Sequence, residues 1–199
     1  MQIQPTSNRI GRFATFGRQD GVSRMNNRYA PRIRLILAGL ILFSCIGCDR
    51  VTKNIASQIL QHSPPQSFLA DTVRLEYVLN PGGFLSLGNN LPDDVRSWIF
   101  IGLNSCMMLA LCAYLLLNLH ISFAVFVSLI FVLAGGVGNQ IDRILNNGLV
   151  IDFINLGVGP LRTGVFNVAD MAVTFGAITA VFFSLRQNAA KPSDASEPR

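Results

Sequence analysis

Two aspartates in the C-terminal third of the chain stand where an acidic side chain is costly. Asp170 lies in a stretch from Thr163 to Leu185 that holds no other charged residue and is long enough to span a membrane. Ionisable groups in such stretches are rare and are usually functional. Asp152 precedes Asp170 across a segment that contains glycine and proline. Two carboxylates that meet at a membrane surface could act together as acid and base on a scissile bond.

The composition indicates a membrane protein. Hydrophobic residues make up 50% of the 199 residues and charged residues 14%, and the apolar residues come in blocks, which is too apolar for an ordinary soluble domain. A helix needs roughly 20 apolar residues to span a membrane. The blocks therefore predict an all-α membrane fold, a bundle of four transmembrane helices at about residues 35–56, 97–117, 121–141 and 166–186.

Basic residues predict how the chain is oriented. Arginines far outnumber acids in the N-terminal region, and Arg186, Lys191 and Arg199 follow the last span. Basic flanks favour the cytoplasm, and four spans place both termini on one side. We therefore expect a disordered basic cytoplasmic arm at residues 1–32, although a targeting peptide would look similar. The membrane domain covers residues 33–186, and residues 187–199 form a cytoplasmic tail. The positive charge follows from this topology and does not indicate nucleic acid.

The two segments on the extracytoplasmic side predict a small β-rich element. Val73–Val78 alternates apolar and polar residues, which is typical of a half-buried strand, and residues 80–83 signal a turn. Residues 148–151 indicate a short strand that enters a loop at Asp152. We expect the chain to turn toward the last helix at Gly157, Gly159 and Pro160, and we expect the second helix to be capped by Asp93 and Asp94.

The predicted topology brings polar residues together at the extracytoplasmic ends of the helices. Asn167 and Asp170 are three positions apart and share a helix face, as do Asn139 and Asp142. At 1.5 Å per residue, Asp170 lies only about 6–10 Å below the start of its helix, which a loop residue such as Asp152 can reach. The residues that converge are Asp49, Asn80, Asn139, Asp142, Arg143, Asp152, Asn167 and Asp170.

These residues alone leave the pairing open. Asp142 rivals Asp152 as the partner of Asp170, and Arg143 could pair with Asp142 or contact a substrate headgroup. Asp49 and Lys53 are spaced to form a helix salt bridge. A proton-coupled transporter, with Asp49, Asp142 and Asp170 along an ion path, is the alternative class of function. The inner halves of the helices are almost wholly apolar, which disfavours such a path.

Neither the histidines nor the cysteines predict a metal site. His62 and His120 are isolated, and neither has metal-ligand spacing with a cysteine or an acid. Cys45 and Cys48 lie in an apolar helix, where we expect them to pack as small hydrophobic side chains.

Five short motifs, in this order, resemble those of the lipoprotein signal peptidases, the signal peptidase II family. The motifs are D-x-x-T-K at 49–53, the loop Asn-Pro-Gly-Gly-Phe at 80–84, G-N-x-x-D-R at 138–143, V-x-D-F at 150–153 and F-N-x-A-D at 166–170. The resemblance runs from about residue 33 to residue 186. The chain departs from the family pattern in its longer N-terminal arm, in Pro81 and Gly83, and in one additional residue between Asp142 and Asp152.

The resemblance implies an aspartic endopeptidase of the bacterial cytoplasmic membrane, with no cofactor and with its active site near the extracytoplasmic face. The implied substrates are prolipoproteins with a diacylglyceryl-modified cysteine, cut just before that cysteine, in contact with membrane lipid. A non-catalytic relative that binds lipoproteins would share the motifs. By match, the catalytic residues are Asp152 and Asp170, the residues that bind substrate or support the site are Asn80, Gly82, Asn139, Arg143 and Asn167, and the structural polar residues are Asp49, Lys53 and Asp142.

Overall fold

The structure is a computed structural model that describes residues 31–82, 92, 95 and 98–189. Several predictions concern residues outside these ranges, and the structure does not test them. They are the basic arm up to residue 30, Gly83 and Phe84 of the loop motif, the capping acids Asp93 and Asp94, and the tail from residue 190 onward.

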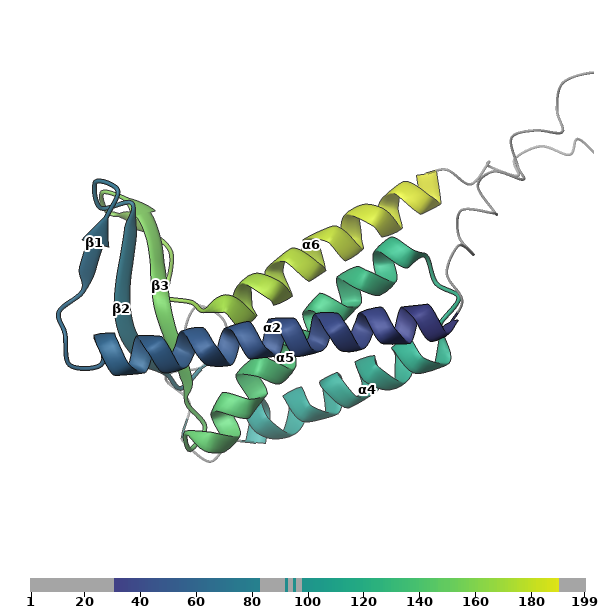
Figure 1. Cartoon of the computed structure of the whole chain (residues 1–199), viewed down its shortest axis with the longest axis horizontal. Helices are drawn as coiled ribbons and strands as arrows, with labels where there is room; N and C mark the ends of the chain where they lie inside the picture. Colours follow the sequence, from purple (N-terminus) through teal and green to yellow (C-terminus); the bar gives the residue numbers. More distant parts are fainter. Residues whose placement is uncertain (1–30, 83–91, 93–94, 96–97, 190–199) are drawn as a thin grey trace, which may run out of the picture.

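Within the residues that the structure describes, four helices are long and apolar enough to cross a membrane, which confirms the predicted fold class (Figure 1). The first is α2, Pro31–Leu60. The second spans Trp98–Leu117 and consists of a π-helical turn η2, Trp98–Leu103, followed by α4, Asn104–Leu117. The third is α5, Phe123–Leu145, and the fourth is α6, Val168–Ala189. At 1.5 Å per residue, α2 is about 45 Å long, longer than the apolar core of a bilayer, so its outer end reaches the sheet.

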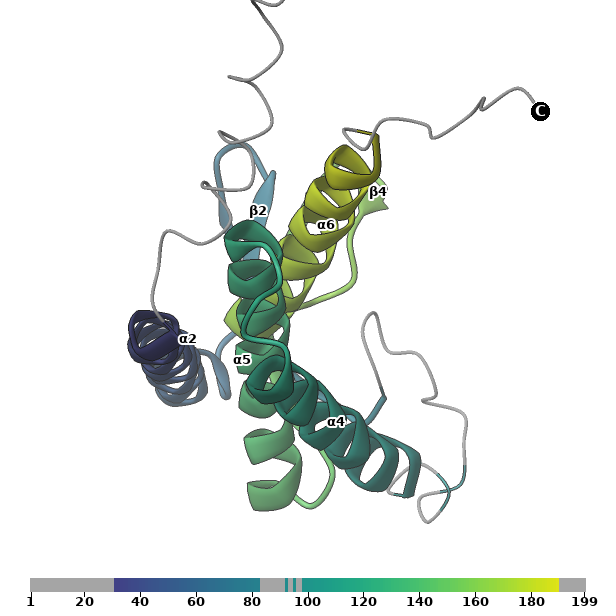
Figure 2. The ribbon, with the colours of Figure 1, turned by 90° about the vertical axis from the view of Figure 1, so that its right-hand side faces the viewer.

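The central helix of the bundle is α5, which contacts α2, α4 and α6 (Figure 2). It lies closest to α6, because glycines remove the side chains between the two backbones. A Cβ atom at Gly176 would lie 2.5 Å from the carbonyl oxygen of Ser128 and 2.9 Å from the backbone nitrogen of Val132. Small residues allow such close approach between membrane helices, where van der Waals packing drives association.

The half of the bundle away from the sheet holds an apolar core formed by Ala38, Leu115, Phe126, Ile130 and Leu133. Many large apolar side chains on the outer faces of the helices are exposed, such as Phe43, Leu109 and Ile178, as expected for surfaces that face lipid. Arg34 is buried near the N-terminal end of α2. It donates a 2.5 Å hydrogen bond to the carbonyl oxygen of Ile121 in the turn between α4 and α5.

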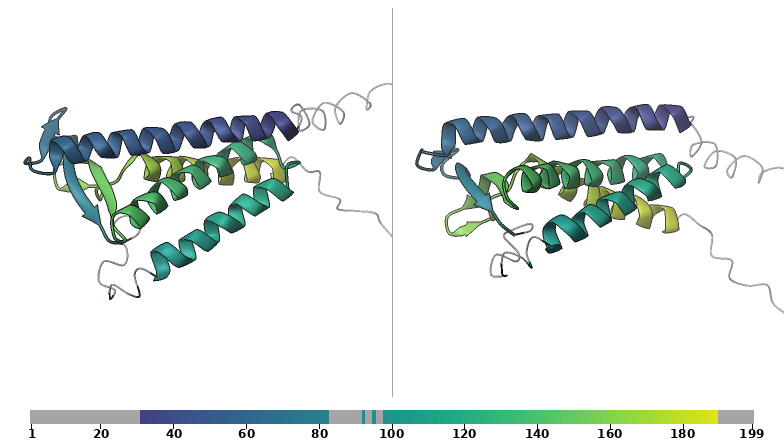
Figure 3. Two further views of the ribbon diagram at one scale, coloured as in Figure 1. Left: turned by 60° about the horizontal axis from the view of Figure 1, so that its bottom comes forward. Right: turned by 90° about the horizontal axis from the view of Figure 1, so that it is seen from below.

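An antiparallel sheet in the order β1-β2-β3-β4 stands at the outer end of the bundle (Figures 1 and 3). Its strands are β1 Gln66–Phe68, β2 Val73–Asn80, β3 Val150–Val158 and β4 Leu161–Arg162. The predicted strand from Val73 is confirmed and runs two residues further, to Asn80.

The second predicted strand is longer than expected. Asp152 lies inside β3 rather than in a loop, opposite Val78 of β2. Gly157 also lies in the strand, where it pairs with Arg162, so placing it in the turn toward the last helix was wrong. The turn is made by Gly159, whose φ of +56° suits glycine, and Pro160. The strand continues because it pairs along most of its length with β2, which is distant in the sequence, and at its end with β4, which follows it in a tight hairpin.

The turn between β1 and β2 is held by charged side chains. Leu69, Ala70 and Asp71 all have positive φ, which is unfavourable for residues other than glycine. The Asp71 carboxylate accepts hydrogen bonds from Arg74 Nε at 2.7 Å and Nη2 at 2.5 Å, and Arg162 donates to the Asp71 carbonyl at 2.7 Å. These contacts offset the backbone strain, and the Arg74 hydrogen bonds lower the pKa of Asp71.

The close contact between α5 and α6 can be tested with one substitution at two sites. Gly176→Ala should lower the free energy of unfolding by about 1–3 kcal/mol, because the added methyl group overlaps the backbone of α5. Gly47→Ala is the matched control, since a Cβ atom there has no neighbour within 4 Å. Thermal unfolding in detergent micelles measures both, and equal transition temperatures for the two variants would contradict the packing described here.

Candidate active site

A fully buried lysine organises the outer end of the bundle. Lys53 has no exposed surface. Its Nζ atom lies 2.8 Å from Asp49 Oδ2 and 2.8 Å from Asp142 Oδ2, and donates to Asn139 Oδ1 at 3.0 Å. Arg50 forms a second ion pair with Asp142. The predicted salt bridge between Asp49 and Lys53 is therefore confirmed, within a cluster of two acids and two bases whose charges cancel.

The same two acids attach the elements that carry Asp152 and Asp170. Asp142 Oδ2 accepts a hydrogen bond from the backbone N–H of Ile151 at 3.1 Å, at the start of β3. Asp49 Oδ1 accepts one from the backbone N–H of Ala169 at 2.9 Å, in the first turn of α6. The buried charge cluster thus fixes the residue next to each candidate aspartate.

Asn167 joins the two candidate aspartates. Its side-chain oxygen accepts a hydrogen bond from the backbone N–H of Asp170 at 2.9 Å, and the Asp170 carboxylate accepts one from the backbone N–H of Asn167 at 3.2 Å. This reciprocal pair is a capping box at the start of α6. An asparagine at this position also offers an amide donor, and its Nδ2 donates to Asp152 Oδ1 at 2.7 Å.

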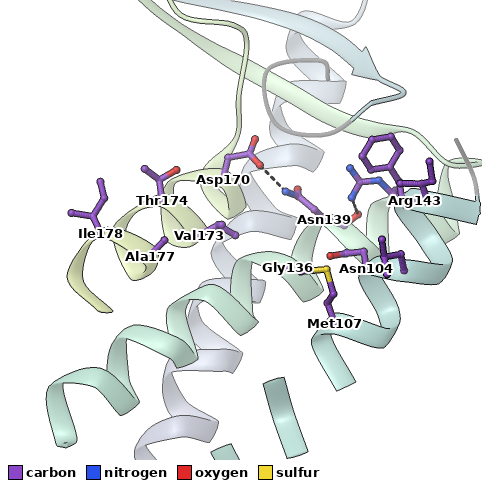
Figure 4. A pocket seen from close by; sticks show the side chains of 13 residues that line it. Asn104, Met107, Gly136, Asn139, Arg143, Asp170, Val173, Thr174, Ala177 and Ile178 are labelled. Carbon is purple, nitrogen blue, oxygen red and sulfur yellow. Dashed lines mark hydrogen bonds between the residues drawn. The ribbon is translucent and has the colours of Figure 1, made fainter. Parts of the chain in front are cut away.

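Two further asparagines complete the arrangement. Asn80 donates from Nδ2 to Asp152 Oδ2 at 2.8 Å, and Asn139 donates from Nδ2 to Asp170 Oδ1 at 2.8 Å (Figure 4). Neither Asp152 nor Asp170 has an ion-pair partner in the part of the chain that the structure describes. Neutral amides therefore hold these two carboxyl groups, whereas Asp49 and Asp142 are paired with cations.

The environment of Asp152 favours its protonated form. The side chain is 1% exposed. The pKa of Asp152 is raised to about 7, chiefly by burial and also by the nearby charge of Asp170, against the lowering effect of the hydrogen bonds from Asn80 and Asn167. A carboxyl group that titrates near neutral pH can either donate or accept a proton.

Arg143 does not pair with Asp142, so that alternative was wrong: Lys53 and Arg50 already occupy the carboxylate. Instead Arg143 Nη2 donates to the carbonyl oxygen of Gly82 at 3.0 Å. The backbone N–H of Gly82 donates to Asn80 Oδ1 at 2.9 Å. Arg143 thereby fixes Gly82, two residues after the asparagine that holds Asp152.

Grooves reach Asp170 from two sides. One, of about 570 Å³, lies between η2/α4, α5 and α6; Asp170, Asn139 and Arg143 stand at its polar end, and Val173, Ala177 and Ile178 continue it inward (Figure 4). The other, of about 540 Å³, lies between α6 and the sheet and is lined by apolar residues that include Leu156, Phe166, Met171 and Phe175. An extended or helical peptide at membrane depth can therefore approach the carboxyl group.

Sequence reasoning missed a set of polar contacts between the second span and Gln140 of the third. Gln140 Nε2 donates to the carbonyl oxygen of Ile101 at 3.0 Å and to Ser105 Oγ at 2.9 Å, and Asn104 Nδ2 donates to Gln140 Oε1 at 2.7 Å. The signal that could have revealed these contacts was the presence of an amide residue in each of two adjacent apolar spans. Across residues 31–82, 92, 95 and 98–189, no three His, Cys, Asp or Glu residues are grouped so that they could hold a metal ion.

Because the charges of the cluster cancel, we predict that a second substitution can recover stability lost by removing Lys53. Lys53→Met should destabilise the protein strongly, by about 3–5 kcal/mol, because it leaves the buried cluster with one excess negative charge. Adding Asp49→Asn restores neutrality, with Arg50 still paired to Asp142, and should recover part of the lost stability. Thermal unfolding of the single and double variants measures this, and a double variant less stable than Lys53→Met would contradict the account.

The chain matches known proteins over most of its length. The family model described as Signal peptidase (SPase) II matches residues 41–186. The lipoprotein signal peptidase of Desulforapulum autotrophicum is 29% identical over 158 residues, 79% of this chain and 94% of that protein. The lipoprotein signal peptidase of Paraburkholderia phymatum is 32% identical over 140 residues, 70% of this chain and 81% of that protein.

A solved structure described as a bacterial membrane enzyme shares the fold. It has a TM-score of 0.69 and 22% identity, and the match covers 81% of this chain and 94% of that chain. The segment that the family model matches, residues 41–186, contains all five motifs and therefore Asp152 and Asp170. The chain belongs to the signal peptidase II family, the lipoprotein signal peptidases.

Proposed function

We propose that Asp152 and Asp170 are the catalytic dyad of an aspartic endopeptidase. The enzyme removes signal peptides from prolipoproteins by cleaving just before a cysteine that carries a diacylglyceryl group. The observation that carries this proposal is the shared partner of the buried Asp152 and the partly buried Asp170: Asn167 binds both carboxyl groups, and neither is in an ion pair with a described residue. Family membership supports the peptidase activity and the class of substrate.

The proposed chemistry follows from two acids close together in a medium of low dielectric. Both cannot ionise cheaply, so they share one proton. The ionised carboxylate takes a proton from a water molecule as that water attacks the scissile carbonyl carbon. The protonated carboxyl group hydrogen-bonds the carbonyl oxygen and then supplies the proton for the leaving amine. The macroscopic pKa values belong to the pair rather than to one residue.

The supporting residues suit this chemistry because they are neutral where they touch the dyad. Asn80, Asn139 and Asn167 orient the carboxyl oxygens through hydrogen bonds of 2.7–2.8 Å. A cation in the same position would favour two ionised carboxylates and remove the shared proton. Asp142, the rival member of the dyad, has two such cations and therefore fits a structural role, together with Asp49 and Lys53.

The proposed location is a bacterial cytoplasmic membrane, with both termini in the cytoplasm and the dyad near the extracytoplasmic face. The groove between α4 and α6 would receive the signal peptide from the lipid, and the acyl chains of the substrate would remain in the membrane. The apolar core around Phe126 and Ile130 separates the polar residues of the site from the inner helix ends, which argues against an ion path.

Removing either carboxyl group tests the dyad. Asp152→Asn and Asp170→Asn should each reduce cleavage of a lipidated precursor roughly 10³-fold or more, since each loses a group that transfers a proton. Glu76→Gln, the same change of chemistry on strand β2, is the control and should retain activity. The assay is product release in detergent, with the unlipidated precursor run in parallel. Turnover near the level of the unmodified enzyme in either Asp variant would refute the proposed dyad.

The pH dependence tests the shared proton. Because burial raises the pKa of Asp152 to about 7, the pair holds its proton below that pH and loses it as the pH rises. We expect kcat/KM to fall as the pH increases through about 7. Thermal unfolding at each pH separates this loss from denaturation. A rate that stays constant or rises well into the alkaline range, with the fold intact, is inconsistent with the proposal.

A further inference from the structure

A second polar cluster lies between α5 and the helix that begins with η2, and the proposed chemistry does not use it. Gln140 is 8% exposed. A glutamine side chain has two N–H donors and an acceptor oxygen. All three groups are engaged: Nε2 donates to Ile101 and Ser105, and Oε1 accepts from Asn104. Gln140 therefore joins the central helix to the second span at three points.

The π-helical turn η2 explains one of these contacts. In a π-turn the backbone hydrogen-bond ladder is displaced, and a carbonyl at membrane depth needs another donor. Gln140 supplies that donor to Ile101. The next turn of the helix is thereby fixed in rotation, and Asn104 lies on the wall of the groove that reaches Asp170.

Asn104 presents an unused acceptor to that groove. Its Nδ2 is bound to Gln140, whereas its Oδ1 accepts no hydrogen bond from the residues that the structure describes. Figure 4 shows Asn104 on the α4 side of the groove, with α5 between it and the α6 residues that include Asp170. The side chains further inward, such as Val173 and Ala177, are apolar.

A peptide that is cut in this groove needs such an acceptor. A peptide bond within a helix has its N–H and C=O groups engaged and its carbonyl carbon shielded, so the substrate must unwind around the scissile bond. Each N–H group released at membrane depth costs free energy unless an acceptor replaces its helical partner.

We propose that Asn104, oriented by Gln140, binds the substrate by accepting a hydrogen bond from a backbone N–H group of the unwound signal peptide, on the groove wall opposite Asp170. This inference rests on the proposed function and adds a substrate-binding residue to it. Gln140 is a positioning residue, because it acts through Asn104 and does not face the substrate.

The test combines enzyme variants with substrates that lack one N–H group. Asn104→Leu and the smaller Asn104→Ala remove the acceptor and should lower kcat/KM for a lipidated precursor peptide about tenfold. Gln140→Leu should cause a loss of similar size, and the double variant Asn104→Leu/Gln140→Leu should lose little more than either single variant. Asn118→Leu, the same change at the inner end of α4, is the matched control and should cleave normally.

Amide-to-ester substitution in the peptide, made at one position at a time around the scissile bond, locates the partner. At one position the ester should lower kcat/KM about tenfold with the unmodified enzyme and hardly at all with Asn104→Leu or Asn104→Ala. A merely structural role for Asn104 would lower the rates for all substrates equally and leave no such coupling.

The outcomes separate the two proposals. Failure of the unmodified enzyme to cleave the all-amide precursor would overturn the proposed function. Normal cleavage by that enzyme, with no ester position coupled to Asn104, would overturn this inference and leave the dyad standing. Asn104 variants that cleave as well as the unmodified enzyme would overturn the inference in the same way.

Discussion

The ion pairs of Lys53 are the interaction on which the rest of the site depends. A buried ammonium group is tolerated only if opposite charges and acceptors surround it, and here Asp49, Asp142 and Asn139 all lie within 3.0 Å of its Nζ atom. Each of the two acids also holds a backbone N–H group, one at the start of β3 and one in the first turn of α6. The ion pairs of Lys53 therefore join three helices and the sheet at the point where the proposed chemistry occurs.

This arrangement sorts four acids of the site into two kinds. Asp49 and Asp142 form ion pairs with Lys53 and Arg50, as expected for structural groups. Asp152 and Asp170 receive hydrogen bonds from the amides of Asn80, Asn139 and Asn167. Amides fix the positions of the carboxyl oxygens without fixing their charge, so a proton can move within the pair. The capping box at Asn167 has two roles. It starts α6, and because the Asn167 amide also binds Asp152, it holds Asp170 near Asp152.

The spans and the convergence of the polar residues could be predicted from the sequence. Lipid requires a minimum length of apolar helix and makes a charged side chain costly. Asp170 was identifiable for that reason. Which polar side chains pair with one another was harder to predict from the sequence. Arg143 follows Asp142 in sequence, but the carboxylate belongs to Lys53 and Arg50 on another helix. Asp152 was placed outside the strand because the pairing of β3 with β2 is non-local. Gly157 was placed in the turn because β4, its hairpin partner, has only two residues and gives no strand pattern in the sequence. Gln140 and Asn104 carry no charge, and hydropathy does not reveal a π-turn.

The central claim is that Asp152 and Asp170 hold one proton between them near neutral pH. Infrared spectroscopy of the carbonyl stretch of protonated carboxyl groups tests it most directly, with the protein in detergent and the pH raised through about 7. We expect a band below that pH that disappears above it and that is altered by both Asp152→Asn and Asp170→Asn. The absence of a protonated carboxyl band at neutral pH, or a band that neither substitution changes, would contradict the account.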